Sequence, residues 1–136
     1  MPGMDAQELG KVALFKDLSE DDIRALATYA DEVTVSEGKH LVDEGGYAYD
    51  LFVILEGKAQ VVVGGEVVAE LGPDDFFGEA GVIEKQERNA TVVAKTRMRL
   101  VTLTGWDLRR MRRQLGPVMD KLEAAIRERR PEPTSS

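Results

Sequence analysis

The stretch that decides the fold runs from Phe76 to Thr91 and reads FFGEAGVIEKQERNAT. Two phenylalanines end an apolar strand, and Gly78 lets the backbone turn or approach another group closely. The residues from Glu79 onward can begin a short helical turn, whose first backbone N–H groups have no partner inside the helix. Arg88, folded back over those N–H groups, would complete a concave site for one phosphate. The stretch therefore predicts an anion-binding loop at a strand end.

Glu79 limits what this loop can bind. A carboxylate 4 Å from a phosphate repels it by about 4 kcal/mol at an effective dielectric constant near 20. Glu79 must therefore accept hydrogen bonds from neutral hydroxyl groups, and a sugar hydroxyl beside the phosphate would serve. Alternatively, Glu79 and Arg88 pair with each other and only brace the loop.

Composition excludes several classes of protein. The 136 residues suffice for one domain with its own core, and the absence of cysteine excludes disulfides and cysteine-ligated metal sites. The longest apolar run, Leu51 to Leu55, is too short to cross a bilayer, and the N-terminus lacks the features of a signal peptide. We expect a cytoplasmic protein that does not enter the membrane.

Charge is distributed unevenly along the chain. The net charge is −7, which argues against a nucleic-acid surface over the whole domain. Residues 97–130 nevertheless contain ten Lys or Arg against four Asp or Glu. This basic part is either a solvated helix face or a docking surface for an acidic partner or for the acidic body of the chain itself.

The middle of the chain has the pattern of a small β domain. Short β-branched runs alternate with glycine-containing turns, and Gly64-Gly65 is typical of a two-residue hairpin. The predicted strands are Glu32–Ser36, His40–Val42, Leu51–Leu55, Lys58–Val63, Glu66–Leu71, Thr91–Thr96 and Arg97–Thr104. The pattern predicts a mainly β fold with flanking helices, a double-stranded β-helix or jelly roll. The stretch from Phe76 to Thr91 is expected to interrupt the last hairpin.

Helical patterns flank these strands. We expect one helix over Asp5 to Phe15 and a second that begins at a capping box of Ser19 and Asp22. A third helix follows a capping box at Thr104, and Gly116-Pro117 separates it from a last helix that ends near Arg130. Residues 1–130 then form one domain, and residues 131–136 a disordered tail. The apolar face of the last helix packs on the barrel, caps a purine or pairs with a second copy; its residues are Val118, Met119, Leu122 and Ile126.

The residues give no basis for catalysis. His40 is the only histidine, no cysteine compensates for it, and a metal site of the cupin type needs several such ligands. The glycines also lack the spacing of a nucleoside triphosphate loop. We expect no metal site and no enzyme, with His40 on the surface.

Around Gly78 and Arg88, the chain resembles a known family. Phe77-Gly78-Glu79, a short helix and Arg88-Asn89-Ala90-Thr91 look like the phosphate-binding cassette of cyclic nucleotide-binding domains. These domains occur in the catabolite activator protein, in kinase regulatory subunits and in cyclic-nucleotide-gated channels. The strand and turn from Leu51 to Gly57 also fit the family, so the resemblance covers roughly Val12 to Leu115.

The resemblance implies a ligand and the residues that hold it. Glu79 would bind the ribose 2′-hydroxyl and Arg88 the cyclic phosphate of cAMP or cGMP, and the remaining binding residues would be Gly78, Ala80, Asn89 and Ala90. Three positions depart from the family pattern: Ala80-Gly81-Val82 replaces Leu-Ala-Leu, Glu87 replaces a proline, and Asn89 stands where alanine, serine or threonine is more common. The base preference therefore stays open.

The resemblance also implies how a signal leaves the domain. Trp106–Leu115 would be a hinge helix and Pro117–Ile126 a lid that closes over the base, signalling to a partner protein or a second copy. We expect no direct DNA binding, because the helix-turn-helix of bacterial relatives lies beyond the last helix and only a short tail follows here. The alternative is a degenerate domain that has lost its nucleotide and serves protein contacts.

Overall fold

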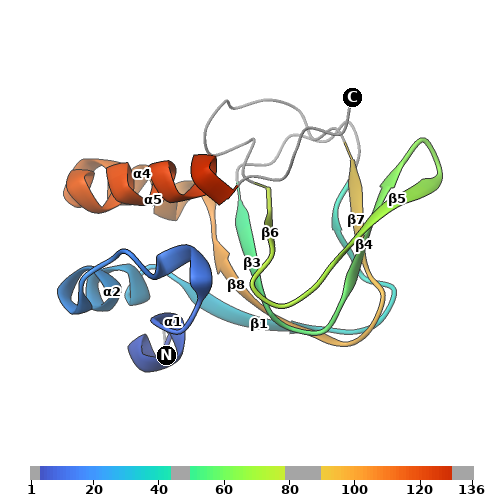
Figure 1. The fold of residues 1–136 in the computed structure, drawn as a ribbon, viewed down its shortest axis with the longest axis horizontal. Coiled ribbons are helices and arrows are strands. Elements are labelled where there is room, and N and C mark those ends of the chain that lie inside the picture. Colours follow the sequence, from blue (N-terminus) through green and yellow to red (C-terminus); the bar gives the residue numbers. More distant parts are fainter. Residues whose placement is uncertain (1–3, 44–49, 79–89, 130–136) are drawn as a thin grey trace.

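The structure is a computed structural model that describes residues 4–43, 50–78 and 90–129. Its strands form two four-stranded antiparallel sheets, ordered β1-β8-β3-β6 and β2-β7-β4-β5, which face each other in Figure 1. The strands are β1 (Asp31–Val35), β2 (His40–Val42), β3 (Leu51–Glu56), β4 (Ala59–Val63), β5 (Glu66–Leu71), β6 (Phe76–Phe77), β7 (Thr91–Ala94) and β8 (Met98–Leu103). The predicted mainly β fold of the jelly-roll kind is confirmed.

Predicted and observed strands agree closely. His40–Val42 and Glu66–Leu71 have the predicted bounds, and the other predicted strands differ by one or two residues at an end. Gly64 and Gly65 form the predicted hairpin turn, with φ of 59° and 84°. This turn joins β4 and β5, which pair from Val63 and Glu66 onward.

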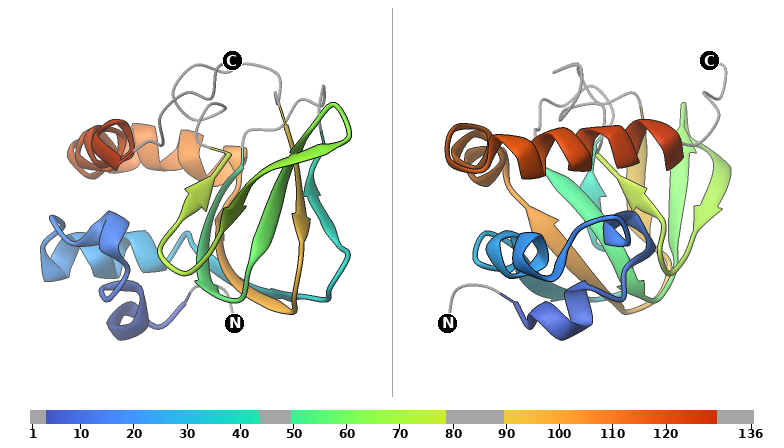
Figure 2. Two further views of the ribbon diagram at one scale, coloured as in Figure 1. Left: turned by 45° about the vertical axis from the view of Figure 1, so that its right-hand side comes forward. Right: turned by 60° about the vertical axis from the view of Figure 1, so that its left-hand side comes forward.

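The helices lie together against one sheet. They are α1 (Ala6–Leu9), the 3-10 turn η1 (Ala13–Phe15), α2 (Glu20–Ala27), α4 (Gly105–Gln114) and α5 (Gly116–Arg129). Figures 1 and 2 show them on the outer side of the sheet that contains β3 and β8. The two predicted capping boxes are confirmed: the Asp22 N–H donates to Ser19 Oγ at 3.0 Å, and the Asp107 N–H donates to Thr104 Oγ1 at 3.1 Å.

The prediction of one helix over Asp5 to Phe15 is wrong. The helix ends at Leu9 with Gly10 as its C-cap, and a short 3-10 turn follows from Ala13. Asp74, far along the chain, accepts a hydrogen bond from the Ala13 N–H at 3.1 Å. This contact takes the amide that a continuous helix would need, and glycine weakens the helix just before it.

The expectation that the stretch from Phe76 to Thr91 interrupts a hairpin is also wrong. β6 pairs with β3 in one sheet, whereas β7 pairs with β2 and β4 in the other. The segment between them therefore joins the two sheets. Pairing across the barrel cannot be read from local spacing, because it depends on residues distant in sequence.

Two apolar cores hold the domain together. One lies between the helices and the first sheet and includes the apolar face of α5, whose four side chains are at most 6% exposed: Val118, Met119, Leu122 and Ile126. Of the three alternatives for this face, the structure therefore shows packing inside the chain. The other core lies between the sheets and includes Ile54, Met98 and Leu100.

Arg99 on β8 connects three elements of the fold. Its Nε donates to Glu32 of β1 at 2.8 Å, and its terminal nitrogens donate to Glu56 of β3 and Glu8 of α1, each at 2.5 Å. These charge-assisted hydrogen bonds raise the pKa of Arg99, and they lower the pKa of Glu32. The arginine thus ties the N-terminal helix to the sheet.

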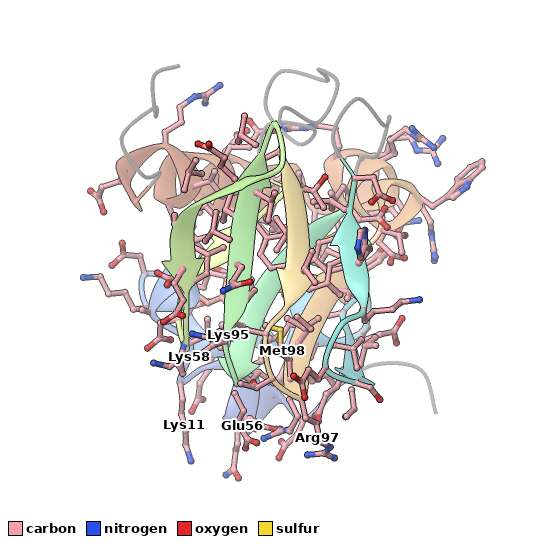
Figure 3. The ribbon with its side chains drawn as sticks, turned by 90° about the vertical axis from the view of Figure 1, so that its right-hand side faces the viewer. Lys11, Glu56, Lys58, Lys95, Arg97 and Met98 are labelled. Atoms are coloured by element: carbon pink, nitrogen blue, oxygen red, sulfur yellow. The ribbon has the colours of Figure 1, made fainter. Side chains whose placement is uncertain are left out.

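Gly57 provides a test of the tight end of the barrel, where Figure 3 shows its neighbours Glu56 and Lys58 close to Arg97 and Met98. Gly57 has φ of 93°, and an added Cβ would lie 2.4 Å from the Arg97 carbonyl oxygen. Gly38 has a similar φ of 89°, but nothing lies within 4 Å of its added Cβ.

We expect Gly38→Ala to lower the free energy of unfolding by about 1–2 kcal/mol, the cost of a left-handed residue with a side chain. Gly57→Ala should cost about 1–3 kcal/mol more, because the new methyl group must displace backbone. Urea denaturation of both variants measures this difference. If both variants lost the same free energy of unfolding, the close approach to Arg97 would contribute nothing to the cost.

The Arg99 contacts predict a pH dependence. A carboxyl group whose pKa is lowered by folding stabilises the protein above its unfolded pKa, about 4.3 for glutamate, and this stability is lost as pH falls through the folded value. Arg99→Gln should therefore lower Tm at pH 7, and the gap to wild type should shrink below about pH 4. Arg97→Gln is the control, because Arg97 is exposed and has no ion pair within the described residues. A gap independent of pH would contradict the assignment.

Candidate functional site

The predicted binding segment is only partly described. Glu79, Ala80, Arg88 and Asn89 lie outside the described residues. Gly78 and Ala90, at its two ends, lie within them. The structure therefore shows the frame that holds the segment, and the roles of the six predicted binding residues stay predictions.

The first end of the segment is fixed by β6. Phe77 pairs with Phe52 of β3, and the two rings stack with centroids 4.9 Å apart and an interplanar angle of 13°. Gly78 follows with φ of 88°, a conformation that residues with a side chain rarely adopt. The chain therefore leaves the strand through a turn that favours glycine, as the sequence predicted.

The second end is fixed in the other sheet. Ala90 leads into β7, where Thr91 pairs with Val62, and the next residue, Val92, is buried. Figure 1 shows the last residues of β6 and the first residues of β7 at the same end of the barrel. We call this end of the barrel the cassette end. It is marked by the first residues of β3 and β7 and the last residues of β4 and β6, which are Leu51, Thr91, Val63 and Phe77.

The apolar interior is filled unevenly along the barrel. Away from the cassette end, Ala59 and Met98 are at most 1% exposed. Along β4, alternate residues become less buried toward the cassette end: Val61 is partly buried, and Val63 is 40% exposed. Apolar surface is therefore partly uncovered where the predicted binding segment attaches. The sequence does not predict this feature, because the consecutive apolar residues Val61-Val62-Val63 leave open which of them face the interior.

The helical layer reaches the cassette end at α4. The N–H of Gly105, the first residue of α4, donates to Asp50 Oδ1 at 3.0 Å. Asp50 directly precedes β3, the strand that pairs with β6. The start of the predicted hinge helix is thus attached to the framework of the candidate site.

A second connection runs through the turn before β6. Asp74, with φ of 74°, accepts from the Ala13 N–H of η1, while its own N–H donates to the Ile54 carbonyl at 2.9 Å. η1 in turn contacts α5. The sequence did not predict that Asp50 and Asp74 connect the barrel to the helices. Their only signal in the sequence is an aspartate shortly before a strand, which is common in turns.

The described residues contain no arrangement typical of metal catalysis. His40 is exposed, as predicted, and its Nδ1 lies 2.9 Å from Asp43 Oδ1. Within the described ranges, no group of three or more His, Cys, Asp or Glu could hold a metal ion. In the same part of the chain, every helix is too short or too polar to cross a membrane.

The curated proteins to which this chain is similar include regulatory subunits of cAMP-dependent protein kinase. The regulatory subunit of cAMP-dependent protein kinase from Yarrowia lipolytica is 35% identical over 117 residues, which cover 85% of this chain and 30% of that protein. The chain thus spans less than a third of the length of this curated relative. Relatives of this kind are regulatory subunits and binding domains, which at the level of the family are not enzymes.

Two solved structures have the same fold. The N-terminal domain of a transcriptional regulator from Streptomyces coelicolor A3(2) is 28% identical with a TM-score of 0.76, covering 90% of this chain and 91% of that one. The regulatory subunit of a protein kinase A from Trypanosoma brucei, a kinase described as cAMP-independent, was solved as a triple-substitution variant bound to cAMP. It is 27% identical with a TM-score of 0.74, covering 88% of this chain and 45% of that one.

The family model described as "Cyclic nucleotide-binding domain" matches residues 32–114, which include β1 except its first residue, β2 to β8 and α4. The match covers more than half of the chain. It also includes the segment between Gly78 and Ala90, which joins the two sheets at the cassette end. The chain belongs to the cyclic nucleotide-binding domain family.

Proposed function

We propose that this chain is a non-catalytic sensing module that binds a cyclic nucleotide, cAMP or cGMP, through the segment from Gly78 to Ala90. The observation that carries the proposal is the frame of this segment: both ends are anchored at one end of the barrel, beside partly uncovered apolar side chains of β4. Membership of the family supplies the ligand class. We further propose one domain over residues 1–130 with a tail at 131–136, and a cytoplasmic location.

Each part of a cyclic nucleotide has a matching group in this proposal. The guanidinium of Arg88 offers a planar fork of donors to the cyclic phosphate. The Glu79 carboxylate accepts from the ribose 2′-hydroxyl, while Gly78, Ala80, Asn89 and Ala90 shape the loop around the phosphate. Val61 and Val63 give the base apolar surface to pack on.

The relative from Trypanosoma brucei supports the role that we assign to Arg88. Its cAMP-bound form carries three substitutions, one of which replaces a threonine by an arginine. That residue type is the one we assign to the phosphate here. The same relative favours the second candidate as well, because the regulatory subunit of a kinase described as cAMP-independent keeps the fold. The second candidate is a domain that has lost nucleotide binding and serves protein contacts.

We propose that signalling runs through the helices that follow the barrel. A ligand can switch the protein only if it contacts two conformations unequally. Two hydrogen bonds are suited to transmit such a difference: Asp50 to Gly105 links the barrel to α4, and Asp74 to Ala13 links the turn before β6 to the helical layer beside α5. The receiving partner is a protein, as the regulatory-subunit relatives suggest.

The phosphate assignment predicts the effect of Arg88→Ala. A hydrogen bond to a charged group contributes about 1.5–3 kcal/mol, so the Kd for the preferred cyclic nucleotide should rise roughly ten- to hundredfold. Calorimetric titration with cAMP, cGMP, linear AMP and guanosine measures the affinity and separates phosphate from base recognition. Arg97→Ala is the control, because Arg97 is exposed at the opposite end of the barrel. Unchanged affinity in Arg88→Ala would remove Arg88 from its role, and no heat with any ligand would favour the second candidate.

The ribose assignment predicts a coupling between Glu79 and one hydroxyl group. Glu79→Gln should weaken cAMP binding about tenfold, since a charge-assisted hydrogen bond becomes a neutral one. The same substitution should leave the affinity for 2′-deoxy-cAMP almost unchanged, because that ligand lacks the hydroxyl. A double-mutant cycle over these four affinities measures the coupling. Equal losses for both ligands would mean that Glu79 acts on the shape of the loop and not on the ribose.

A further inference from the structure

The outer face of α4 carries an unusual set of exposed side chains. They occupy positions i, i+3, i+4 and i+7, which form one stripe along a helix, and they are Trp106, Arg109, Arg110 and Arg113. Trp106 is 70% exposed, the highest value among the large apolar side chains of the described residues. We call these four residues the α4 stripe.

Two aromatic contacts order the stripe. The Arg109 guanidinium lies 4.8 Å from the centroid of the Trp106 ring, and the Arg110 guanidinium lies 5.2 Å from that of Tyr29. Tyr29 also donates its hydroxyl to Gln114 at the end of α4. Such stacking holds a guanidinium in place and leaves its N–H edge available for an anion.

The arginines of the stripe have no carboxylate partner in the described part of the chain. Within the described residues, no carboxylate forms an ion pair with Arg109, Arg110 or Arg113. Six other cations of the described residues have carboxylate partners, whereas Arg97 and Arg127 have none there; the six are Arg24, Lys58, Lys95, Arg99, Arg112 and Lys121. Arg112 on the same helix pairs with Asp120 and Glu123 of α5.

The stripe is not needed to fold the helix. α4 buries Leu108 and Met111 on its inner face and begins at the Thr104 capping box. Arginines three and four residues apart on one exposed face repel each other, which weakens a helix slightly. A chain of net charge −7 nevertheless places three of them around its only tryptophan.

We propose that the α4 stripe is a docking site for an acidic segment of a partner protein, with carboxylates on both sides of one apolar side chain. Tryptophan, tyrosine and arginine are the residues that dominate protein interfaces, and the arginine fork fits carboxylates in pairs. The eight residues from Trp106 to Arg113 span about 10 Å, which suits a short segment. This surface lies on the chain whether or not the cassette binds nucleotide.

Other occupants fit less well. Nucleic acid carries its charge far beyond the length of the stripe and would meet the acidic remainder of a chain with net charge −7, whereas a short acidic segment can stay on the stripe. A membrane surface needs an apolar helix face, and the apolar face of α4 is buried inside the domain. A second copy would need about 800 Å² on each partner for a stable interface, far more than one exposed tryptophan and its neighbours supply.

Selection from a random twelve-residue peptide library displayed on phage tests the proposal with the full chain, without nucleotide. We expect selected peptides to be rich in Asp and Glu around an apolar residue. A synthetic copy of the selected peptide should change the fluorescence of Trp106, because that residue is the only tryptophan of the chain and lies in the stripe. Binding should weaken at least about tenfold in Arg109→Glu/Arg113→Glu.

The matched control is Arg97→Glu/Arg127→Glu, which changes the net charge equally at two exposed arginines outside the stripe. It should shift the affinity less than about threefold, and unchanged thermal midpoints would show that both variants fold. Four outcomes would overturn the proposal. The first is a selected peptide pool that is not enriched in Asp and Glu, and the second is an equal loss of peptide affinity in the two variants. The third is binding of phosphatidylserine vesicles or duplex DNA that depends on the stripe and is stronger than peptide binding. The fourth is self-association of the wild type that the stripe variant abolishes. Nucleotide titrations of the same variants keep this test separate from the proposed function.

Discussion

The pairing of β6 with β3 is the constraint on which the candidate site depends. β6 is only two residues long, and it is held by its ladder to Phe52 and Val53 and by the stacked rings of Phe52 and Phe77. This pairing fixes where Gly78 turns out of the sheet. Because β7 belongs to the opposite sheet, the segment from Gly78 to Ala90 must cross from one sheet to the other. A segment whose two ends are anchored in different sheets is well suited to position binding residues.

Local patterns were sufficient to predict most of the fold. Glycine turns and β-branched runs marked the strands, and both capping boxes form because serine or threonine with aspartate three residues later satisfies helix N–H groups locally. Nonlocal contacts explain the failures. The amide of Ala13 bonds to Asp74, sixty-one residues away, and the two ends of the binding segment join different sheets. For the candidate site, the turn at Gly78 was predictable, whereas the partly exposed Val63 depends on how far the barrel interior is filled.

The placement of charge divides the domain into two kinds of surface. Arg99 is bonded to three glutamates from separate elements, so its charge serves the packing of α1 on the barrel. Arg112 likewise ties α4 to α5 through Asp120 and Glu123. Arg109 and Arg110 on the outer face of α4 contact aromatic rings instead. The same residue type therefore has a structural role where carboxylates surround it, and stays available to a partner where they do not.

Burial energies restrict how the C-terminal helices can respond to a ligand. The apolar face of α5 consists of Val118, Met119, Leu122 and Ile126, and burying one such side chain stabilises a protein by about 1.5–3 kcal/mol. Releasing all four would cost about 6–12 kcal/mol, whereas coupling between two sites is typically about 1–3 kcal/mol. A nucleotide therefore cannot simply lift α5 away from the domain to close over the base. The movement must keep these side chains buried, so we infer that α4 and α5 shift together as one packed unit, joined by Arg112 and attached to the barrel at Asp50 and Gly105.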